Sequence, residues 1–245
     1  ATRGAAQVIV DSHSSQRDII AHLQLPTDRV HAVHLAAGKQ FKPPRNPEPA
    51  NRLRAKYRLP EAYVLYLGGF QSRKNVHHLL AAWTWASSVI DEECHLVIAG
   101  LLPARPDGRL FHNLPAIAAR HGSTESVHFI GAVAEADKPM LYQGASCFVF
   151  PSSYEGFGLP PLEAMACGVP VVTTNAASLP EVVGDAAYLV SDPTDTRKLG
   201  AAIISTIVDT KLADELRTRG LKQAARFSWA QTARETLRIY QLAAY

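Results

Sequence analysis

Residues 148–174 read FVFPSSYEGFGLPPLEAMACGVPVVTT and contain the most informative pattern in the chain. The stretch has an apolar run at each end, a glycine-containing loop, and two adjacent prolines before an alanine-rich segment. Because proline is tolerated in a helix only in its first turn, Pro160 and Pro161 place the start of a short helix near residue 161. Apolar runs without alternation are typical of parallel strands that are buried on both faces. The stretch therefore predicts a strand–helix–strand unit of an α/β protein.

The same alternation of strands and helices extends through most of the chain. Strands are expected at residues 7–12, 62–69, 95–100, 127–131, 147–152, 170–174 and 186–190. Helices are expected at about 14–23, 75–89, 109–121, 135–143, 161–166 and 179–183, and then at 196–207, 213–225 and 228–242 without strands between them. Strands that are joined by helical crossovers pair in parallel, so the expected fold class is α/β with a doubly wound, Rossmann-like parallel sheet.

Residues 38–60 interrupt this alternation, because they contain five prolines and many charged residues. We interpret them as a linker followed by a short polar helix. The strand–helix–strand segment within residues 1–37 is too small to bury a core of its own. It is expected to be the end of a preceding amino-terminal domain, whereas residues 61–227 are expected to form a complete doubly wound domain.

The composition excludes several classes of protein. Hydrophobic residues make up 47% of the 245 residues, which excludes a disordered chain. The net charge is only +3 and the Lys and Arg residues are not clustered, so nucleic acid is not expected as a partner. Cys94, Cys147 and Cys167 suit neither a disulfide framework nor a metal pair, which favours a reducing compartment such as the cytoplasm. No apolar run reaches the ~18 residues that a membrane span needs.

The first candidate ligand site follows the strand expected at 62–69. The sequence LGGFQSRKN (67–75) places Gly68 and Gly69 where a ligand could approach the backbone, and Arg73 and Lys74 where two cations could neutralise a phosphate group. The alternative is an ordinary turn with solvated cations. The spacing is neither a P-loop nor the GxGxxG pattern, which disfavours a nicotinamide-dependent dehydrogenase.

The second candidate site lies within the opening stretch. Glu155 is expected on a loop and Glu163 in the first turn of the following helix. The backbone N–H groups of residues 156–159 and the helix N-terminus would form an anion cradle between the two carboxylates. Such a cradle suits a sugar nucleotide, with N–H groups for the diphosphate and carboxylates for hydroxyl groups. The alternative, a capped helix whose dipole Glu163 complements, leaves Glu155 and the glycines unexplained.

Other patterns are weaker or absent. Ile130 and Gly131 end a strand where a planar base could lie against the backbone, although a plain strand–helix connection is the alternative. HExxH, DxD and paired Cys/His motifs are absent from the sequence, so no metal ligands are predicted. His77 and His78 are expected to point in divergent directions on the surface of a helix.

In the opening stretch, Glu155 and Glu163 form the pattern E-x7-E, followed by AMACGVPVV. This pattern resembles the retaining glycosyltransferases of family 4, which have the GT-B fold. The resemblance covers nearly the whole chain, because YLGGFQSRKN is similar to the family's phosphate-contacting loop and VHFIG to its base-contacting loop. SLPEVVGDAAYLV resembles the following helix and strand, and VIVDSHSSQRDI the last strand and helix of the family's amino-terminal domain.

The resemblance implies roles for individual residues. Glu155 would contact the donor sugar, Glu163 the ribose, and Lys74 with Arg73 the departing diphosphate. Many members have an arginine where this chain has Gly69, and Arg73 is expected to take its place. Backbone groups of the loop and of the strand ends would also bind the donor: Gly68, Gly69, Ile130, Gly131, Gly156, Phe157, Gly158 and Leu159.

The resemblance also implies an activity and a domain organisation. The chain would be the carboxy-terminal, donor-binding domain of a retaining hexosyltransferase, with a mannosyl or deoxyhexosyl group as the favoured cargo. The donor would be a nucleoside-diphosphate sugar, GDP-linked before UDP-linked, with no metal or other cofactor required. The acceptor would be a glycan, a lipid-linked glycan or a small molecule. Residues 228–245 would return towards the missing amino-terminal domain, and the protein would be cytoplasmic, with peripheral association at the inner membrane allowed.

Two alternatives to a transferase remain from the sequence. The first is a GT-B sugar-nucleotide epimerase, which would share the nucleotide site and convert the donor sugar without an acceptor. The second is a binding module without turnover in this shortened form.

Overall fold

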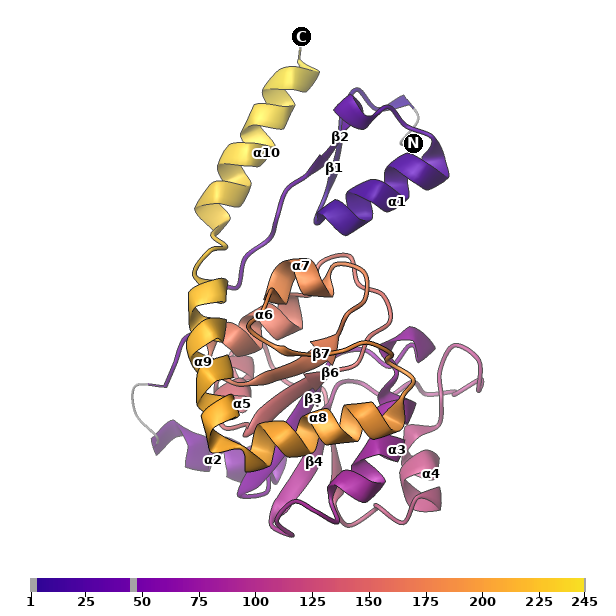
Figure 1. The fold of residues 1–245 in the computed structure, drawn as a ribbon, viewed down its shortest axis with the longest axis vertical. Coiled ribbons are helices and arrows are strands. Elements are labelled where there is room, and N and C mark those ends of the chain that lie inside the picture. Colours follow the sequence, from indigo (N-terminus) through magenta and orange to yellow (C-terminus); the bar gives the residue numbers. More distant parts are fainter. Residues whose placement is uncertain (1–3, 45–47, 245) are drawn as a thin grey trace.

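The computed structural model describes residues 4–44 and 48–244 of the chain. Within these residues, one six-stranded parallel sheet has the strand order β5-β4-β3-β6-β7-β8, and a separate two-stranded parallel sheet pairs β1 with β2 (Figure 1). The strands are β1 (Val8–Val10), β2 (Val30–Ala32), β3 (Ala62–Leu67), β4 (Cys94–Ala99), β5 (Val127–Gly131), β6 (Cys147–Phe150), β7 (Val171–Thr174) and β8 (Tyr188–Val190). The predicted doubly wound parallel sheet is therefore confirmed.

Helices cover both faces of the large sheet. The helices are α1 (His13–Leu23), α2 (Glu48–Tyr57), α3 (Val76–Ala86), α4 (Leu114–Arg120), α5 (Lys138–Gln143), α6 (Leu159–Ala166), α7 (Leu179–Val183), α8 (Thr196–Val208), α9 (Thr210–Ala224) and α10 (Trp229–Ala243), with 3-10 turns η2 (Thr27–Arg29) and η3 (Ser72–Lys74). Helix α3 packs against α4 and α8, whereas α6 packs against α5, α7 and α9. Strand order reverses between β3 and β6, where a doubly wound sheet binds its ligands.

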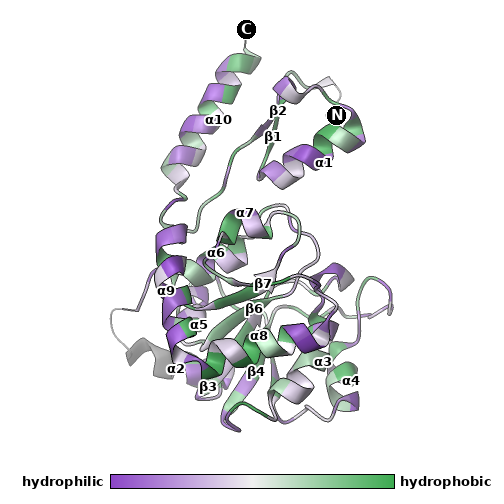
Figure 2. Cartoon of the chain, in the orientation of Figure 1, coloured by the Kyte–Doolittle hydropathy of each residue, from purple (hydrophilic) through white to green (hydrophobic). Residues whose placement is uncertain are grey.

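The core lies in the centre of the large sheet, whose strands are strongly hydrophobic (Figure 2). Val64 of β3 pairs with Leu96 of β4 on one side and with Cys147 of β6 on the other. All three side chains are buried, as expected for strands covered on both faces. Trp83 is fully buried on α3.

The first part of the chain forms a small strand–helix–strand unit, residues 7–32, that lies beside α7 (Figure 1). Residues 33–44 then lead to the large sheet. Helix α10 leaves the large sheet in the same direction, and the Thr232 hydroxyl donates a hydrogen bond of 2.7 Å to the carbonyl of His34. Several large apolar side chains of α10 are exposed: Trp229, Leu237, Tyr240 and Leu242. The predicted domain boundaries stay predictions.

Four helices begin two or more residues from the expected position. One is α9, which begins at Thr210 instead of residue 213, after the capping residue Asp209. Helix α4 begins at Leu114 instead of residue 109, because the Asp107 carboxylate accepts the N–H groups of residues 109–111 and holds them in a turn. Helix α5 begins at Lys138 instead of residue 135. Helix α6 begins at Leu159, two residues earlier than expected, with Gly158 in a left-handed conformation before it. Both prolines still lie in its first turn, as their missing N–H groups require.

None of the described helices is both long and apolar enough to cross a membrane.

Candidate functional site

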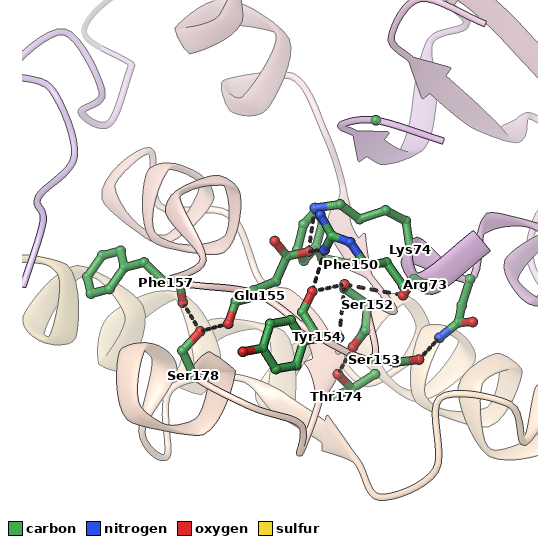
Figure 3. A network of polar contacts seen from close by, with 12 residues as sticks. Arg73, Lys74, Phe150, Ser152, Ser153, Tyr154, Glu155, Phe157, Thr174 and Ser178 are labelled. Carbon is green, nitrogen blue, oxygen red and sulfur yellow. Dashed lines mark hydrogen bonds and ion pairs between the residues drawn. The ribbon is translucent and has the colours of Figure 1, made fainter. Parts of the chain in front are cut away.

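The two candidate motifs meet at the carboxyl ends of β3 and β6, which are adjacent in the sheet. The turn η3 follows β3, and residues 151–158 follow β6. Several hydrogen bonds join these segments. Among them, Ser153 N–H donates to the carbonyl of Arg73 (2.8 Å), and the Asn75 amide donates to the carbonyl of Pro151 (2.9 Å). Loops 81 residues apart in sequence therefore form one site (Figure 3).

Three charged side chains form the centre of this site. The Lys74 ammonium donates a hydrogen bond to the Glu155 carboxylate, and Arg73 Nη1 lies 3.6 Å from Glu155 Oε1 (Figure 3). The Lys74 and Glu155 side chains are only 12% and 11% exposed. Burial lowers the pKa of Lys74, and the hydrogen bond to Glu155 partly offsets this effect. Two cations against one carboxylate leave one positive charge, which suits an anionic ligand.

Residues 154–158 contain Glu155 and present their backbone to this site; we call them the donor loop, after the sugar donor that the sequence predicts for them. The Ser178 hydroxyl lies 2.9 Å from the carbonyl oxygen of Glu155 and 2.6 Å from that of Phe157 (Figure 3). Among the residues that the structure describes, no protein acceptor is found for the N–H groups of residues 155–159. The carbonyl groups of the loop are therefore satisfied by the protein, whereas the N–H groups from residue 155 onward are available to a ligand.

Glu163 lies in the second turn of α6, and the prediction that it lies in the first turn is wrong. The helix begins two residues earlier than the prolines suggested, because proline is accepted at any position of the first turn. The Tyr142 hydroxyl donates a hydrogen bond of 3.0 Å to Glu163 Oε2. Burial raises the pKa of the Glu163 carboxyl, and the Tyr142 hydrogen bond opposes this shift. The side chain is held by α5, and its predicted contact with ribose stays a prediction.

Three glycines bring the ends of β3, β4 and β5 close together. Gly68 N–H donates to the carbonyl of Ala99 (3.1 Å), and Gly100 N–H donates to the carbonyl of Gly131 (2.8 Å). A Cβ atom at Gly100 would lie 2.3 Å from the Gly68 carbonyl oxygen, so no other residue fits there without a shift of the backbone. Gly131 has a φ of +72°, in the left-handed region that favours glycine. Ile130 precedes it and is partly buried against the core.

A cluster of three histidines was missed in the sequence. The imidazole rings of His77 and His78 lie 4.0 Å apart between centroids, and His112 lies 4.0 Å from His77. Burial and the two neighbouring imidazoles lower the pKa of His77 to about 4. The expectation of two divergent surface histidines is wrong, because His112 arrives from a loop whose course the sequence did not reveal.

Another group of three side chains brings together possible metal ligands, which the sequence motifs did not predict. Ligand atoms of His13, His34 and Glu181 lie within 4.8 Å of one another. The Glu181 carboxylate accepts the N–H groups of His13 (2.8 Å) and Ser14 (3.2 Å), and His34 Nε2 lies 2.5 Å from it. In this structure the carboxylate thus caps the N-terminus of α1.

The fold and the site together define a doubly wound α/β protein with a cluster of two cations and one carboxylate at the carboxyl ends of β3 and β6. The family described as glycosyl transferases group 1 matches residues 50–223. O-antigen chain mannosyltransferase B of Escherichia coli is 37% identical over 239 residues, which cover 97% of this chain and 61% of that protein. The serotype-specific mannosyltransferase WbdA of Escherichia coli is 33% identical over 233 residues, which cover 94% of this chain and 28% of that protein.

Solved structures agree with this match. Sucrose-phosphate synthase from Thermosynechococcus elongatus superposes with a TM-score of 0.80 at 27% identity, over 96% of this chain and 57% of that protein. The chain belongs to the glycosyl transferases group 1 family and has the fold of GT-B glycosyltransferases. It spans about three fifths or less of the relatives named above.

Proposed function

We propose that the chain binds a nucleoside-diphosphate sugar and supplies the donor site of a retaining hexosyltransferase. The cluster of Arg73, Lys74 and Glu155 beside the free N–H groups of the donor loop carries this proposal. The cations and N–H groups would stabilise the diphosphate as the bond to the sugar breaks, and Glu155 would accept hydrogen bonds from sugar hydroxyl groups. Fixed donors that face a developing charge are the strongest catalytic device available to such a site.

The names of the relatives support a mannosyl group as the group that is transferred. Both Escherichia coli relatives are named mannosyltransferases, and one is named for the O-antigen chain. We therefore favour a GDP-linked sugar as donor and a glycan or lipid-linked glycan as acceptor, with the acceptor held by a further part of the whole protein. The relatives' names favour a transferase over the epimerase. The cytoplasmic location and a peripheral association with the inner membrane stay predictions.

Thermal unfolding in the presence of nucleotides tests the donor. A ligand that binds only the folded chain stabilises it by RT ln(1 + [L]/Kd), or ~2.7 kcal/mol at a hundredfold excess over Kd. GDP and GDP-mannose should raise the melting temperature more than UDP-, dTDP- and ADP-sugars. If none of the GDP-, UDP-, dTDP- and ADP-linked ligands raises the melting temperature, the result contradicts a donor site in this chain.

Lys74→Ala tests the role of the cations. We expect at least a tenfold loss of GDP affinity, and a loss on the order of 100-fold in donor turnover where the whole protein is assayed. The expected loss of turnover is the same with EDTA present, because the cations of the chain would balance the diphosphate charge.

Lys198→Ala is the matched control, because Lys198 is exposed on α8 and pairs with Asp195 at 3.2 Å. It should bind GDP as the wild type does. Affinity is compared through the ligand-induced shift in melting temperature, since Lys74→Ala also leaves the buried Glu155 with Arg73 alone. Wild-type affinity in Lys74→Ala would overturn the phosphate assignment.

A further inference from the structure

The donor loop is contacted by a segment that lies outside the residues matched by the family. Ser12 precedes α1, is completely buried, and its hydroxyl donates a hydrogen bond of 2.6 Å to the carbonyl of Gly156. The Ser15 hydroxyl lies 3.1 Å from the same oxygen. The Tyr154 hydroxyl, at the start of the loop, donates a hydrogen bond of 2.6 Å to Asp18 on α1. The small unit therefore holds the donor loop at two points, 136 or more residues away in sequence.

These contacts complete a pattern along the loop backbone. Ser178 holds the carbonyl groups of Glu155 and Phe157, and Ser12 holds the carbonyl group of Gly156 between them. Gly156 is a residue whose backbone has many accessible conformations, so the orientation of its peptide groups must be fixed from outside. Because neighbouring N–H and carbonyl groups belong to rigid peptide planes, fixing the carbonyl groups also fixes the directions of the N–H groups.

We infer that Ser12 is a positioning residue for the donor loop, which orients the N–H group of Phe157 through the carbonyl of Gly156. The inference rests on the proposed function for its effect on ligand affinity. It goes beyond that function by making the donor site depend on a residue outside the family match at 50–223. Ser12 also accepts the Ser15 N–H group at 3.0 Å and so caps α1, and this second role must be separated by experiment.

Ser12→Ala, Ser12→Thr and Ser228→Ala form the test set. Ser12→Ala removes both the cap and the hydrogen bond to Gly156, whereas Ser12→Thr keeps a hydroxyl for both. Ser228→Ala is the matched control, because Ser228 caps α10 through the Gln231 N–H group at 3.2 Å. A net hydrogen bond of this kind is worth ~1 kcal/mol, which corresponds to about a fivefold change in an equilibrium constant.

Two measurements are made on each variant: GDP-mannose affinity by calorimetry, and amide hydrogen exchange of residues 154–159 without ligand. We expect Ser12→Ala to bind GDP-mannose about five- to tenfold more weakly and to exchange faster in this loop. Ser12→Thr should restore both, and Ser228→Ala should change neither. If Ser12→Ala fails to fold, Ser15→Ala weakens the same contact without removing the cap.

The outcomes separate the positioning role from the proposed function. Faster amide exchange of the donor loop in Ser12→Ala supports the positioning role whether or not the wild-type protein binds nucleotide. If the wild-type protein binds no nucleotide, only the proposed function is contradicted. The inference is overturned if the wild type binds GDP-mannose and Ser12→Ala changes neither this affinity nor the amide exchange of the loop. Equal effects of Ser12→Ala and Ser228→Ala would also overturn it, because helix capping would then account for both.

Discussion

Glu163 carries a charge that its surroundings disfavour. Burial raises the pKa of this carboxyl above its ordinary value of 4.5. Between 4.5 and the raised value, the folded chain therefore binds more protons at this residue than the unfolded chain does. The free energy of unfolding falls as the pH rises through this window, so a residue proposed to bind ribose costs stability at neutral pH.

Glu163→Gln should remove that cost. The amide oxygen can still accept the Tyr142 hydrogen bond, and no charge is buried. We expect the melting temperature at pH 7 to rise by about 2–4 °C, the effect of ~1 kcal/mol in a domain of this size, with weaker GDP binding. The gain should disappear below pH 4.5, where the wild-type carboxyl is protonated in both states.

The control is Glu215→Gln, because the Glu215 side chain is 46% exposed on α9 and pairs with Arg219 on the surface. Its melting temperature should follow that of the wild type at every pH. The interpretation of Glu163 fails if Glu163→Gln and the wild type differ by the same amount at pH 4 and pH 7.

At the scale of elements, the carboxyl ends of β3, β4 and β5 lie close together because glycines allow them to approach. Gly100 has a φ of +145°, and a Cβ atom there would meet the Gly68 carbonyl oxygen at 2.3 Å. Gly69 has no atom within 4 Å of the corresponding position. The fold therefore requires glycine at position 100, whereas the space beside Gly69 is open to a ligand.

Gly100→Ala should destabilise the chain by at least ~2 kcal/mol, from backbone strain and overpacking together. Gly69→Ala should change stability by less than ~0.5 kcal/mol but weaken GDP binding if the phosphate groups lie over this turn. Denaturant unfolding and GDP calorimetry on both variants measure these effects. Equal stability losses would show that Gly69 also has a structural role.

Much of the element order could be predicted from the sequence, because buried parallel strands are apolar runs and proline marks where helices begin. The sequence placed Lys74 and Glu155 after strand ends, but their contact depends on the pairing of β3 with β6, which was not predicted. The start of α4 could not be predicted, since the Asp107 carboxylate that holds the preceding turn acts through a local geometry common to many loops. The histidine cluster required the path of the loop that carries His112, which the sequence pattern does not reveal.

At the scale of the whole molecule, the joint between the small unit and the large sheet could not be predicted either. Its contacts link residues far apart in sequence, such as the Glu181 carboxylate with the N–H groups of His13 and Ser14. A single carboxylate placed at a helix N-terminus leaves no sequence pattern, because its partners are backbone groups. These contacts between the small unit and the large sheet nevertheless set the position of α1 and of the preceding Ser12 relative to the donor loop.

Acid should loosen this joint, and Glu181→Gln should mimic the acid form at neutral pH. Burial favours a raised pKa of Glu181, but the hydrogen bonds from His13 N–H, His34 and Ser14 N–H outweigh it and hold the pKa below 4.5. A lowered carboxyl pKa contributes stability at neutral pH that is lost as the pH falls through the folded-state value. We expect amide exchange in α1 to rise about tenfold in Glu181→Gln at pH 7, the equivalent of ~1.4 kcal/mol, while β3 stays protected.

Glu215→Gln is the control, because Glu215 is exposed on α9 and pairs with Arg219 at 3.2 Å. Amide exchange in α1 should be the same in this variant as in the wild type. If Glu181→Gln also leaves the exchange of α1 unchanged, the Glu181 carboxylate does not hold the small unit against the large sheet.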